Sequence, residues 1–256
     1  MTHSTNEKHR VVACPTARFT SLLETLGIPC DSRLTTLTQE CFTLVEADGR
    51  LELRPPGEAD VAGISACFPP DQFSGKGSKS ILVRAFGKKT NLIFDLTAGL
   101  GGDAYRLARA GHQVFASERH PAIYALLVSA WARDCEQGCV DLGVPERLEF
   151  NYEEGASVLG SIDQANVGVY LDPMYPMTRR QKALPKRELQ VLRRLLGDEE
   201  DASALLESAR ARAARVVVKR PHRAPPLSPD VSFELSSKLV RFDVYVNPDK
   251  MGEASS

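Results

Sequence analysis

The sequence lacks the features that would place a protein in a membrane, outside the cell or around a structural metal. No apolar run approaches the ~20 residues that a membrane-spanning helix needs. The polar start, MTHSTNEKHR, has no apolar stretch of the kind that a secretory signal contains. The six cysteines include no C-x-x-C pair, so we expect reduced thiols and no bound metal. A cytoplasmic protein with no membrane contact and no metal is therefore predicted.

Nor does the sequence have an excess of charge of one sign. Its 32 Lys and Arg residues against 33 Asp and Glu residues give a formal net charge of -1. A chain this balanced has no global field for polyanions, so contact with a nucleic acid must come from local basic patches. With 43% of its 256 residues hydrophobic, it can fill one large core or one core with a small appendage. It has no internal repeats, and nothing in it points to a particular oligomeric state.

What is present falls into two parts, of which residues 1–72 are predicted to form a small N-terminal α+β lobe. FTSLLETLGI, which begins at Phe19, has the pattern of a short amphipathic helix that ends at Gly27. CFTLVEADGRLELRP alternates around Asp48-Gly49, a dipeptide typical of two-residue hairpin turns. Two proline pairs, at 55–56 and 69–70, then interrupt the chain.

Residues 73–256 are predicted to form the larger domain. A helix is expected in SKSILVRAFG, closed by Gly87. From Asn91 onward, apolar β runs (NLIFDLT, HQVFASE, RLEFN, VGVYLD and RVVVKRP) alternate with helical segments (GGDAYRLARA, PAIYALLVSAWARD, RELQVLRRLLG and DASALLESARARAA). VSFELSSKLVRFDVYV follows as a closing antiparallel pair. We therefore expect an α/β fold with a Rossmann-like, mostly parallel, doubly wound sheet and a C-terminal antiparallel strand pair.

The first candidate site is DLTAGLGGDA, where a strand ends and glycines turn the chain into a helix. Gly99, Gly101 and Ala104 fit the pattern G-x-G-x-x-A. Small residues in such a turn let backbone N–H groups and the helix N-terminus approach a ligand closely. Glu118 ends the next strand, where an acidic side chain can accept hydrogen bonds from both hydroxyls of a ribose. The pattern fits a dinucleotide such as NAD or S-adenosylmethionine; without a ligand it is a tight strand-to-helix turn.

Two further acids favour S-adenosylmethionine over the dinucleotide. Asp95 lies on the strand before the glycines, and Asp103 follows them. A carboxylate cluster is unfavourable beside a pyrophosphate, because both are negatively charged. The same cluster suits a ligand that carries a sulfonium and an α-ammonium group. We therefore predict an S-adenosylmethionine site formed by Asp95, Gly99, Gly101, Asp103 and Glu118.

The second candidate site is VYLDPMYPMTRR, in which an apolar strand ends on Asp172. Because ligands of open α/β sheets lie at the carboxyl ends of strands, Asp172 is expected in the same crevice as the glycine turn. The Asp172 carboxylate and the Pro173 carbonyl could accept the two N–H bonds of an exocyclic amine and stabilise the positive charge that grows during methylation. Proline keeps these acceptors aimed, and Tyr175 offers a ring on which a base can stack. In an ordinary loop, Asp172 would cap a helix and Tyr175 would be a core residue.

Two basic segments follow strands at the same predicted edge of the sheet. If they converge on the rim of the crevice they can contact RNA phosphates; otherwise they are solvated surface charges. The candidate RNA-binding residues are Arg179, Arg180, Lys182, Lys186 and Arg187 in the first segment, and Lys219, Arg220 and Arg223 in the second.

Four stretches, taken in order, resemble one known family. DLTAGLGGDAYRLARAGHQV, ERHP, YLDPMYP and RVVVKRPHRAPPL are similar to segments of the RsmJ (YhiQ) family, and the similarity runs from about Phe73 to Tyr245. The resemblance implies a class I methyltransferase fold and S-adenosylmethionine-dependent methylation of the N2 amine of a guanine in 16S ribosomal RNA. Its partner would be that RNA or the small ribosomal subunit. DPMYP also resembles the broader [DNS]-P-P-[YFW] loop of amino-methyltransferases, from which it departs at Met174.

The resemblance also implies where the cofactor binds. The implied contacts are Gly102, Asp103, Glu118, Arg119, Glu154, Gly155 and Asp172. Glu154 departs from the small hydroxyl residues that the family has at this position. Which atoms here would form the hydrogen bond with the adenine amine is therefore left open. The Glu154 carboxylate could still accept a hydrogen bond from that amine.

Other functions stay open at this point. The same chemistry could act on a DNA adenine or a protein glutamine, although the basic rim disfavours protein and the absence of a separate DNA-reading domain disfavours DNA. A dehydrogenase would explain Gly99 and Glu118 but not the D-P-x-Y stretch. A non-catalytic ribosome-assembly factor could use the fold only to hold RNA, but the intact Asp172 and Tyr175 argue for activity.

Overall fold

The chain divides into two compact units. The computed structural model describes residues 10–14, 17–31, 40–58, 61–68, 80–162, 164–174, 187–197 and 201–252. Unit 1 comprises Met1–Cys67, His120–Arg133 and Met174–Glu199, and unit 2 comprises Phe68–Arg119, Asp134–Pro173 and Glu200–Ser256. The division into domains of residues 1–72 and 73–256 stays a prediction.

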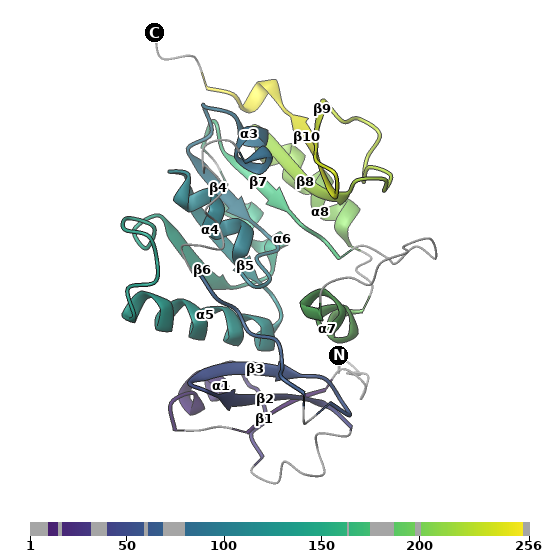
Figure 1. Ribbon diagram of the computed structural model, residues 1–256. Helices are drawn as coiled ribbons and strands as arrows, with labels where there is room; N and C mark the ends of the chain where they lie inside the picture. The colour runs from purple at the N-terminus through teal and green to yellow at the C-terminus, as the bar shows by residue number, and fades with distance from the viewer. Residues whose placement is uncertain are drawn as a thin grey trace. The chain divides into compact units, whose positions relative to one another are not determined.

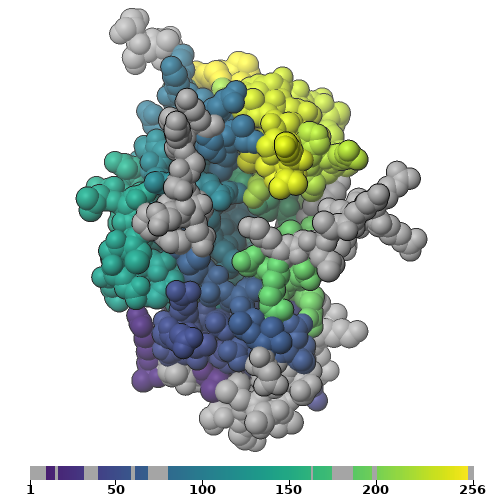
Figure 2. All heavy atoms as spheres, in the orientation of Figure 1, coloured from purple at the N-terminus to yellow at the C-terminus, as the bar shows by residue number. Residues whose placement is uncertain are grey.

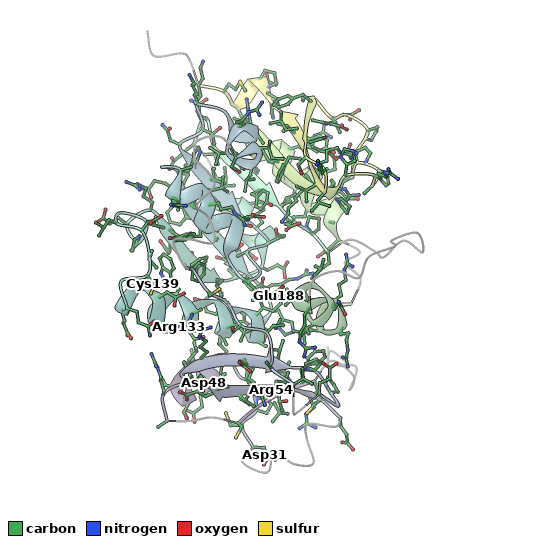
Figure 3. The ribbon with its side chains drawn as sticks, viewed as in Figure 1. Asp31, Asp48, Arg54, Arg133, Cys139 and Glu188 are labelled. Carbon is green, nitrogen blue, oxygen red and sulfur yellow. The ribbon has the colours of Figure 1, made fainter. Side chains whose placement is uncertain are left out.

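Unit 1 contains a three-stranded sheet and a short helix near the N-terminus (Figure 1). The elements are β1, Val11–Cys14; α1, Thr20–Thr25; β2, Phe42–Ala47; and β3, Arg50–Arg54. The sheet order is β1-β2-β3, with β1 parallel to β2 and β2 antiparallel to β3. The turn between β2 and β3 lies at Asp48 (labelled in Figure 3) and Gly49, whose φ angles of 52° and 71° fit the predicted hairpin. The small α+β lobe is therefore present, and β1 is an addition that the sequence pattern did not predict.

Unit 2 is built around a seven-stranded sheet (Figure 1). Its strands are β4, Leu92–Asp95; β5, Gln113–Glu118; β6, Leu148–Tyr152; β7, Gly168–Leu171; β8, Arg215–Pro221; β9, Phe233–Ser236; and β10, Val240–Val246. The sheet order is β6-β5-β4-β7-β8-β10-β9. β4 to β8 pair in parallel, whereas β10 pairs antiparallel with β8 and β9. The predicted mostly parallel sheet with a C-terminal antiparallel pair is confirmed. In Figure 2, residues of the C-terminal part of the chain (yellow) lie on the surface.

Helices connect the parallel strands and cover the sheet of unit 2. Those of unit 2 are α3, Ile81–Phe86; α4, Gly102–Arg109; α6, Gly155–Val158; and α8, Ala202–Arg212, with the short 3-10 turns η4, Leu159–Ser161, and η5, Pro248–Lys250. α5, Pro121–Glu136, begins in unit 1 and ends in unit 2, and α7, Arg187–Leu196, belongs to unit 1. In the described part of the chain, no helix has the length and apolar character to cross a membrane.

The core of unit 2 explains why β7 and the Val216–Val218 part of β8 are apolar. Val169 of β7, Val216 of β8 and Leu206 of α8 belong to one cluster and are each at most 1% exposed. All four residues of β7 are buried, as expected of a parallel strand that is covered on both faces. The continuous apolar runs in the sequence are therefore the centre of the sheet.

The strand order places a ligand crevice at β4. From β4 the chain builds outward on one side through β5 and β6, and then returns to the other side for β7 and β8. Open α/β sheets bind ligands at such a switch point, beyond the carboxyl ends of the strands. Here those ends carry Asp95 on β4, Glu118 on β5 and Asp172 directly after β7.

Gly168, the first residue of β7, sets how closely α3 approaches the sheet. A Cβ atom at this position would lie 2.7 Å from Cδ1 of Phe86 and 2.8 Å from Cγ2 of Thr90. Phe86 is 1% exposed, so it has little room to move aside. We expect Gly168→Ala to lower the free energy of unfolding by about 1–3 kcal/mol, the usual cost of overpacking a core, as measured by urea denaturation.

Gly160→Ala is the matched control, because its added Cβ atom would meet nothing within 4 Å. Its free energy of unfolding should stay within about 0.5 kcal/mol of the wild-type value. Equal denaturation midpoints for the two variants would contradict the tight contact between Gly168 and α3.

Candidate functional site

The glycine turn between β4 and α4 leaves its backbone open to a ligand. Gly99 and Gly101 have φ angles of 55° and 79°, a left-handed conformation that residues with a Cβ atom rarely adopt. A Cβ atom on Gly102 would meet nothing within 4 Å, and one on Gly99 only the Thr97 carbonyl oxygen at 3.9 Å. The Gly101 N–H donates to the Ala98 carbonyl oxygen at 2.8 Å, which closes the turn. Gly99 and Gly102 therefore border open space at the start of α4.

Glu118, at the end of β5, holds this turn in place. Its Oε2 atom accepts a hydrogen bond from the Gly99 N–H at 2.9 Å, and the Ser117 carbonyl oxygen accepts from the Ala98 N–H at 3.0 Å. Glu118 is 7% exposed. The sequence predicted that this side chain would accept hydrogen bonds from both hydroxyls of a ribose; here one of its carboxylate oxygens also accepts from the backbone of the turn. The carboxylate is nevertheless at the predicted place, beside the glycines.

A lysine joins the two acids that the sequence assigned to the site. Lys219, on β8, donates from Nζ to Oδ2 of Asp172 and to Oδ2 of Asp103, both at 2.7 Å. The Tyr170 hydroxyl donates to the same oxygen of Asp103 at 2.7 Å, and Arg106 forms an ion pair with Asp103. Lys219 was predicted to contact RNA on the rim of the crevice. Its ammonium group instead points into this acidic cluster, so we leave Lys219 out of the proposed RNA surface.

Burial and charge act in opposite directions on these three groups. Burial raises the pKa of Asp103, but the charge and hydrogen bond of Lys219, the charge of Arg106 and the hydrogen bond of Tyr170 together outweigh burial and lower that pKa to about 2. Burial raises the pKa of Asp172, with Lys219 opposing the rise and Asp103 adding to it. Burial lowers the pKa of Lys219, but the two carboxylates raise it above its ordinary value. At neutral pH, Lys219 is therefore charged beside an ionised Asp103.

Asp95 is the most deeply buried acid of the site. It is 1% exposed at the end of β4, and its Oδ1 atom accepts from the Thr97 N–H at 3.0 Å. Burial, assisted by the negative charges of Asp103 and Asp172, raises the pKa of Asp95 to about 8. It is therefore mostly protonated at neutral pH. Of the residues that the structure describes, no three His, Cys, Asp or Glu side chains are grouped so as to hold a metal ion.

The chain after β7 is tied to the loop after β4. The Asp172 N–H donates to Oγ1 of Thr97 at 2.7 Å, so the two predicted ligand-binding loops meet. Pro173 is buried, and Tyr175 lies outside the described residues, so the acceptor role of the Pro173 carbonyl and the stacking of a base stay predictions. Sequence reasoning missed Thr97 and Tyr170; each lies two residues from an acid already assigned to the site, which was the available signal.

Arg119, Glu154 and Gly155 lie near the carboxyl ends of β5 and β6. Arg119 donates from Nη1 to Oδ2 of Asp201 at 2.8 Å and to Oε1 of Glu154 at 3.4 Å. Both acids are exposed, so these ion pairs add little stability. A Cβ atom on Gly155 would lie 2.7 Å from the Leu96 carbonyl oxygen. Close packing against Leu96 therefore explains why a glycine stands at the start of α6. Contacts of these residues with a cofactor stay a prediction.

The other predicted RNA-binding residues have different surroundings. Arg223 is exposed beyond the end of β8. Arg220 is 2% exposed and donates from Nε and Nη2 to the Pro225 carbonyl oxygen, so we also leave it out of the proposed RNA surface. Arg187, in unit 1, pairs with Glu58 at 2.9 Å. Arg179, Arg180, Lys182 and Lys186 lie outside the described residues.

Sequence similarity to known proteins extends over most of the chain. The family model described as "Putative SAM-dependent methyltransferase" matches residues 30–247, where SAM denotes S-adenosylmethionine. The chain is 37% identical to the ribosomal RNA small subunit methyltransferase J of Serratia proteamaculans, over 84% of this chain and 90% of that protein. It is 38% identical to the protein of the same name from Coxiella burnetii, over 82% of this chain and 85% of that protein.

A solved structure has the same fold. The crystal structure of a SAM-dependent methyltransferase from Neisseria gonorrhoeae superimposes with a TM-score of 0.70 at 26% identity, and the match covers 92% of this chain and 95% of that one. The predicted class I methyltransferase fold is confirmed by this likeness and by the order of the strands. The chain therefore belongs to the ribosomal RNA small subunit methyltransferase J family of SAM-dependent methyltransferases.

Proposed function

We propose that this protein transfers a methyl group from SAM to the exocyclic N2 amine of a guanine in 16S ribosomal RNA. The observation that carries the proposal is the place of Asp172. Its backbone is bonded to the loop after β4, and its carboxylate shares Lys219 with Asp103 at the start of α4. An acceptor for an amine thus lies next to an open glycine turn. The RNA class is supported by the relatives, which are named as small-subunit ribosomal RNA methyltransferases.

The charges of the site suit a cationic cofactor. Asp103 and Asp172 supply carboxylates, Lys219 neutralises only part of their charge, and the buried Asp95 can ionise when a cation approaches. Such a cluster attracts sulfonium and ammonium groups and repels a pyrophosphate, which weighs against a dehydrogenase. SAM supplies a methyl group that its sulfonium charge makes electrophilic. The residues that would hold it are Asp95, Gly99, Gly101, Gly102, Asp103 and Glu118, with Arg119, Glu154, Gly155 and Asp172 nearby.

Asp172 has the central role in the proposed reaction. The lone pair of guanine N2 is conjugated with the ring, so the amine is a poor nucleophile. A carboxylate that accepts an N–H hydrogen bond reduces this conjugation and stabilises the positive charge that grows on N2 as the new N–C bond forms. The S–C bond of the sulfonium would break in the same step, and its electron pair would stay on sulfur. The proton that N2 then loses can pass to Asp172, whose pKa burial raises. The Pro173 carbonyl is the proposed second acceptor, and Tyr175 the proposed stacking surface.

The fold fixes the amine acceptor before a base arrives. Thr97 holds the backbone of Asp172, and Lys219 holds its side chain. Alignment of reacting groups accounts for a large part of the acceleration in transfers of this kind. A guanine paired in a duplex would first have to leave its stack. Its flanking phosphates would meet Arg223 and the basic residues that follow the loop, Arg179, Arg180, Lys182 and Lys186.

The proposed function is tested by the modification state of 16S RNA in a strain that lacks this protein. We expect one N2-methylguanine to be missing, to return with the wild-type gene, and to stay missing with Asp172→Ala, as measured by mass spectrometry of nuclease fragments. Unchanged N2-methylguanine would refute the proposal. Loss of a methylated adenine or a methylated protein glutamine would favour the other targets. Impaired subunit assembly with methylation intact would favour a non-catalytic assembly factor.

Glu118→Gln is expected to weaken SAM binding about tenfold or more while the glycine turn stays folded. The glutamine oxygen can still accept from the Gly99 N–H, a bond of 2.9 Å in the wild type. The negative charge that strengthens hydrogen bonds from ribose hydroxyls is lost. Isothermal titration calorimetry measures the change. Glu149→Gln, which alters an exposed acid on β6, should bind as the wild type does; equal affinities for the two variants would place the ribose clamp on another residue.

A further inference from the structure

Lys219 connects the candidate catalytic residue to the helix that follows the glycine turn. Its Nζ atom lies 2.7 Å from Oδ2 of Asp172 and 2.7 Å from Oδ2 of Asp103. The side chains of Lys219, Asp172 and Asp103 are 27%, 38% and 13% exposed, so the contact is partly sheltered from water. Among the described residues, Lys219 is the only hydrogen-bond donor to the Asp172 carboxylate, and it meets one of the two oxygens.

We propose that Lys219 is a positioning residue for methyl transfer: it holds one oxygen of the Asp172 carboxylate, presents the other to the target amine, and keeps that carboxylate ionised. The proposal rests on the proposed function of Asp172 as the amine acceptor. Lys219 itself touches neither the amine nor the methyl group. When SAM is saturating, so that its contact with Asp103 does not limit the reaction, the effect of Lys219 on the rate passes through Asp172.

The charges around Asp172 explain why its carboxylate needs a neighbouring cation. The titratable groups that interact with it are Asp95 on β4, Asp103 on α4, Tyr170 on β7 and Lys219 on β8. Arg106 pairs with Asp103, and Tyr170 is a neutral phenol because burial raises its pKa well above the ordinary value. Without Lys219, two carboxylates would share a sheltered site, which favours uptake of a proton by one of them. A protonated Asp172 would lose the charge that stabilises the forming cation.

Two other roles for Lys219 predict different experimental results. A contact with an RNA phosphate would require the ammonium group to turn away from both acids, and its loss would weaken RNA binding at every pH. A purely structural ion pair between β8 and α4 would change stability, and any loss of rate would be the same across the pH range. Only the positioning role ties the rate to the protonation of Asp172.

The experiment is the single-turnover rate of methylation as a function of pH, with saturating SAM and small-subunit RNA. We expect Lys219→Met and Lys219→Gln to be slowed about a hundredfold at neutral pH. The acidic limb of their pH–rate profile should move upward by about one pH unit or more. The difference in rate from the wild type should therefore become smaller as the pH rises. Lys219→Arg, which keeps the charge, should keep the limb near the wild-type position. RNA affinity should stay within roughly threefold of the wild type in all three variants, because phosphate contacts come from other residues.

Lys250→Met is the matched control, since Lys250 is exposed in η5 and its carbonyl oxygen accepts from the Asn166 N–H near the amino end of β7. It lies at the edge of the sheet opposite the site, and its rate and pH profile should equal those of the wild type. Circular dichroism verifies that the variants fold, and Lys219→Gln carries the test if Lys219→Met does not fold.

An acidic limb that stays in place in the neutral variants would overturn the positioning role, and so would a defect confined to RNA affinity. A wild-type protein that does not methylate small-subunit RNA would instead refute the proposed function. The two failures are therefore distinguishable in the same set of measurements.

Discussion

Asp172→Ala is expected to slow methyl transfer by a factor of about 10³ or more, the scale on which a preorganised group that stabilises transition-state charge acts. The loop should survive the change, because Asp172 is bonded to Thr97 through its backbone N–H and not through its side chain. Lys219 keeps its second partner, Asp103. The loss should therefore fall on the amine, while SAM affinity stays within about tenfold of the wild type. Incorporation of labelled methyl groups measures the first quantity, and calorimetry the second.

Asp172→Asn separates the charge of this side chain from its shape. The amide keeps an oxygen acceptor in the same place but has no negative charge, so we expect a rate between those of the wild type and the alanine variant. Near-normal turnover in Asp172→Ala would move the amine acceptor away from β7. A normal maximal rate in both variants, with SAM affinity strongly reduced, would assign Asp172 to the cofactor alone.

The strands and the main acids of the site could be predicted because their signals are local. The continuous apolar run of Val169, Tyr170 and Leu171 is typical of a strand that is buried on both faces. Gly99 and Gly101 follow a strand and adopt positive φ angles, so their residue type alone indicates the turn. Since parallel strands end at one edge, Asp172 could be placed beside that turn from the strand order.

Lys219 and Arg220 illustrate what local patterns cannot supply. Adjacent side chains point to opposite faces of a strand, but the sequence does not say what covers either face. Lys219 meets acids that come from α4 and β7, and Arg220 meets the carbonyl oxygen of Pro225. Both were predicted on an RNA rim from their charge and from their place at the predicted carboxyl edge of the sheet. The partners that give each residue its role are distant in sequence or depend on the course of a loop.

β1 and the packing role of Gly155 were not predicted, for the same reason. β1 pairs with β2 in parallel, an arrangement that needs a long connection and has no turn signal of its own. The glycine at the start of α6 is required by Leu96, which lies on another connection of the sheet. In each case the constraint is a contact between separate segments.

In the wild-type protein, ionisation of the buried Asp95 is expected to lower the free energy of unfolding as the pH rises. Asp95→Asn is expected to abolish this decrease. The pKa of Asp95 is raised from an ordinary 3.8 to about 8 in the folded protein, chiefly by burial. Between these values the folded state holds a proton that the unfolded chain has released. The free energy of unfolding therefore falls as the pH rises through this window and levels off above it. At about 1.4 kcal/mol per pH unit over this window, the whole effect is about 6 kcal/mol at most.

The asparagine variant keeps the hydrogen bond that the fold requires. Its Oδ1 atom can accept from the Thr97 N–H, a bond of 3.0 Å in the wild type, and an amide does not ionise in this range. Urea denaturation at roughly pH 5, 7 and 9 should show the smallest difference between the two proteins at the lowest pH, and a gap in favour of Asp95→Asn that widens toward the highest. A difference that is constant over this range would mean that Asp95 is ionised in the folded protein.

The same titration should couple to SAM binding. A sulfonium or ammonium group beside Asp95 favours its ionised form, so binding should release a proton near neutral pH. The proton appears as a difference between the binding enthalpies measured in two buffers of different ionisation enthalpy. Asp95→Asn has no proton to release and offers no charge, so it should bind SAM more weakly and without that difference. Tight binding by the variant, together with no proton release by the wild type, would show that Asp95 does not contact the cofactor.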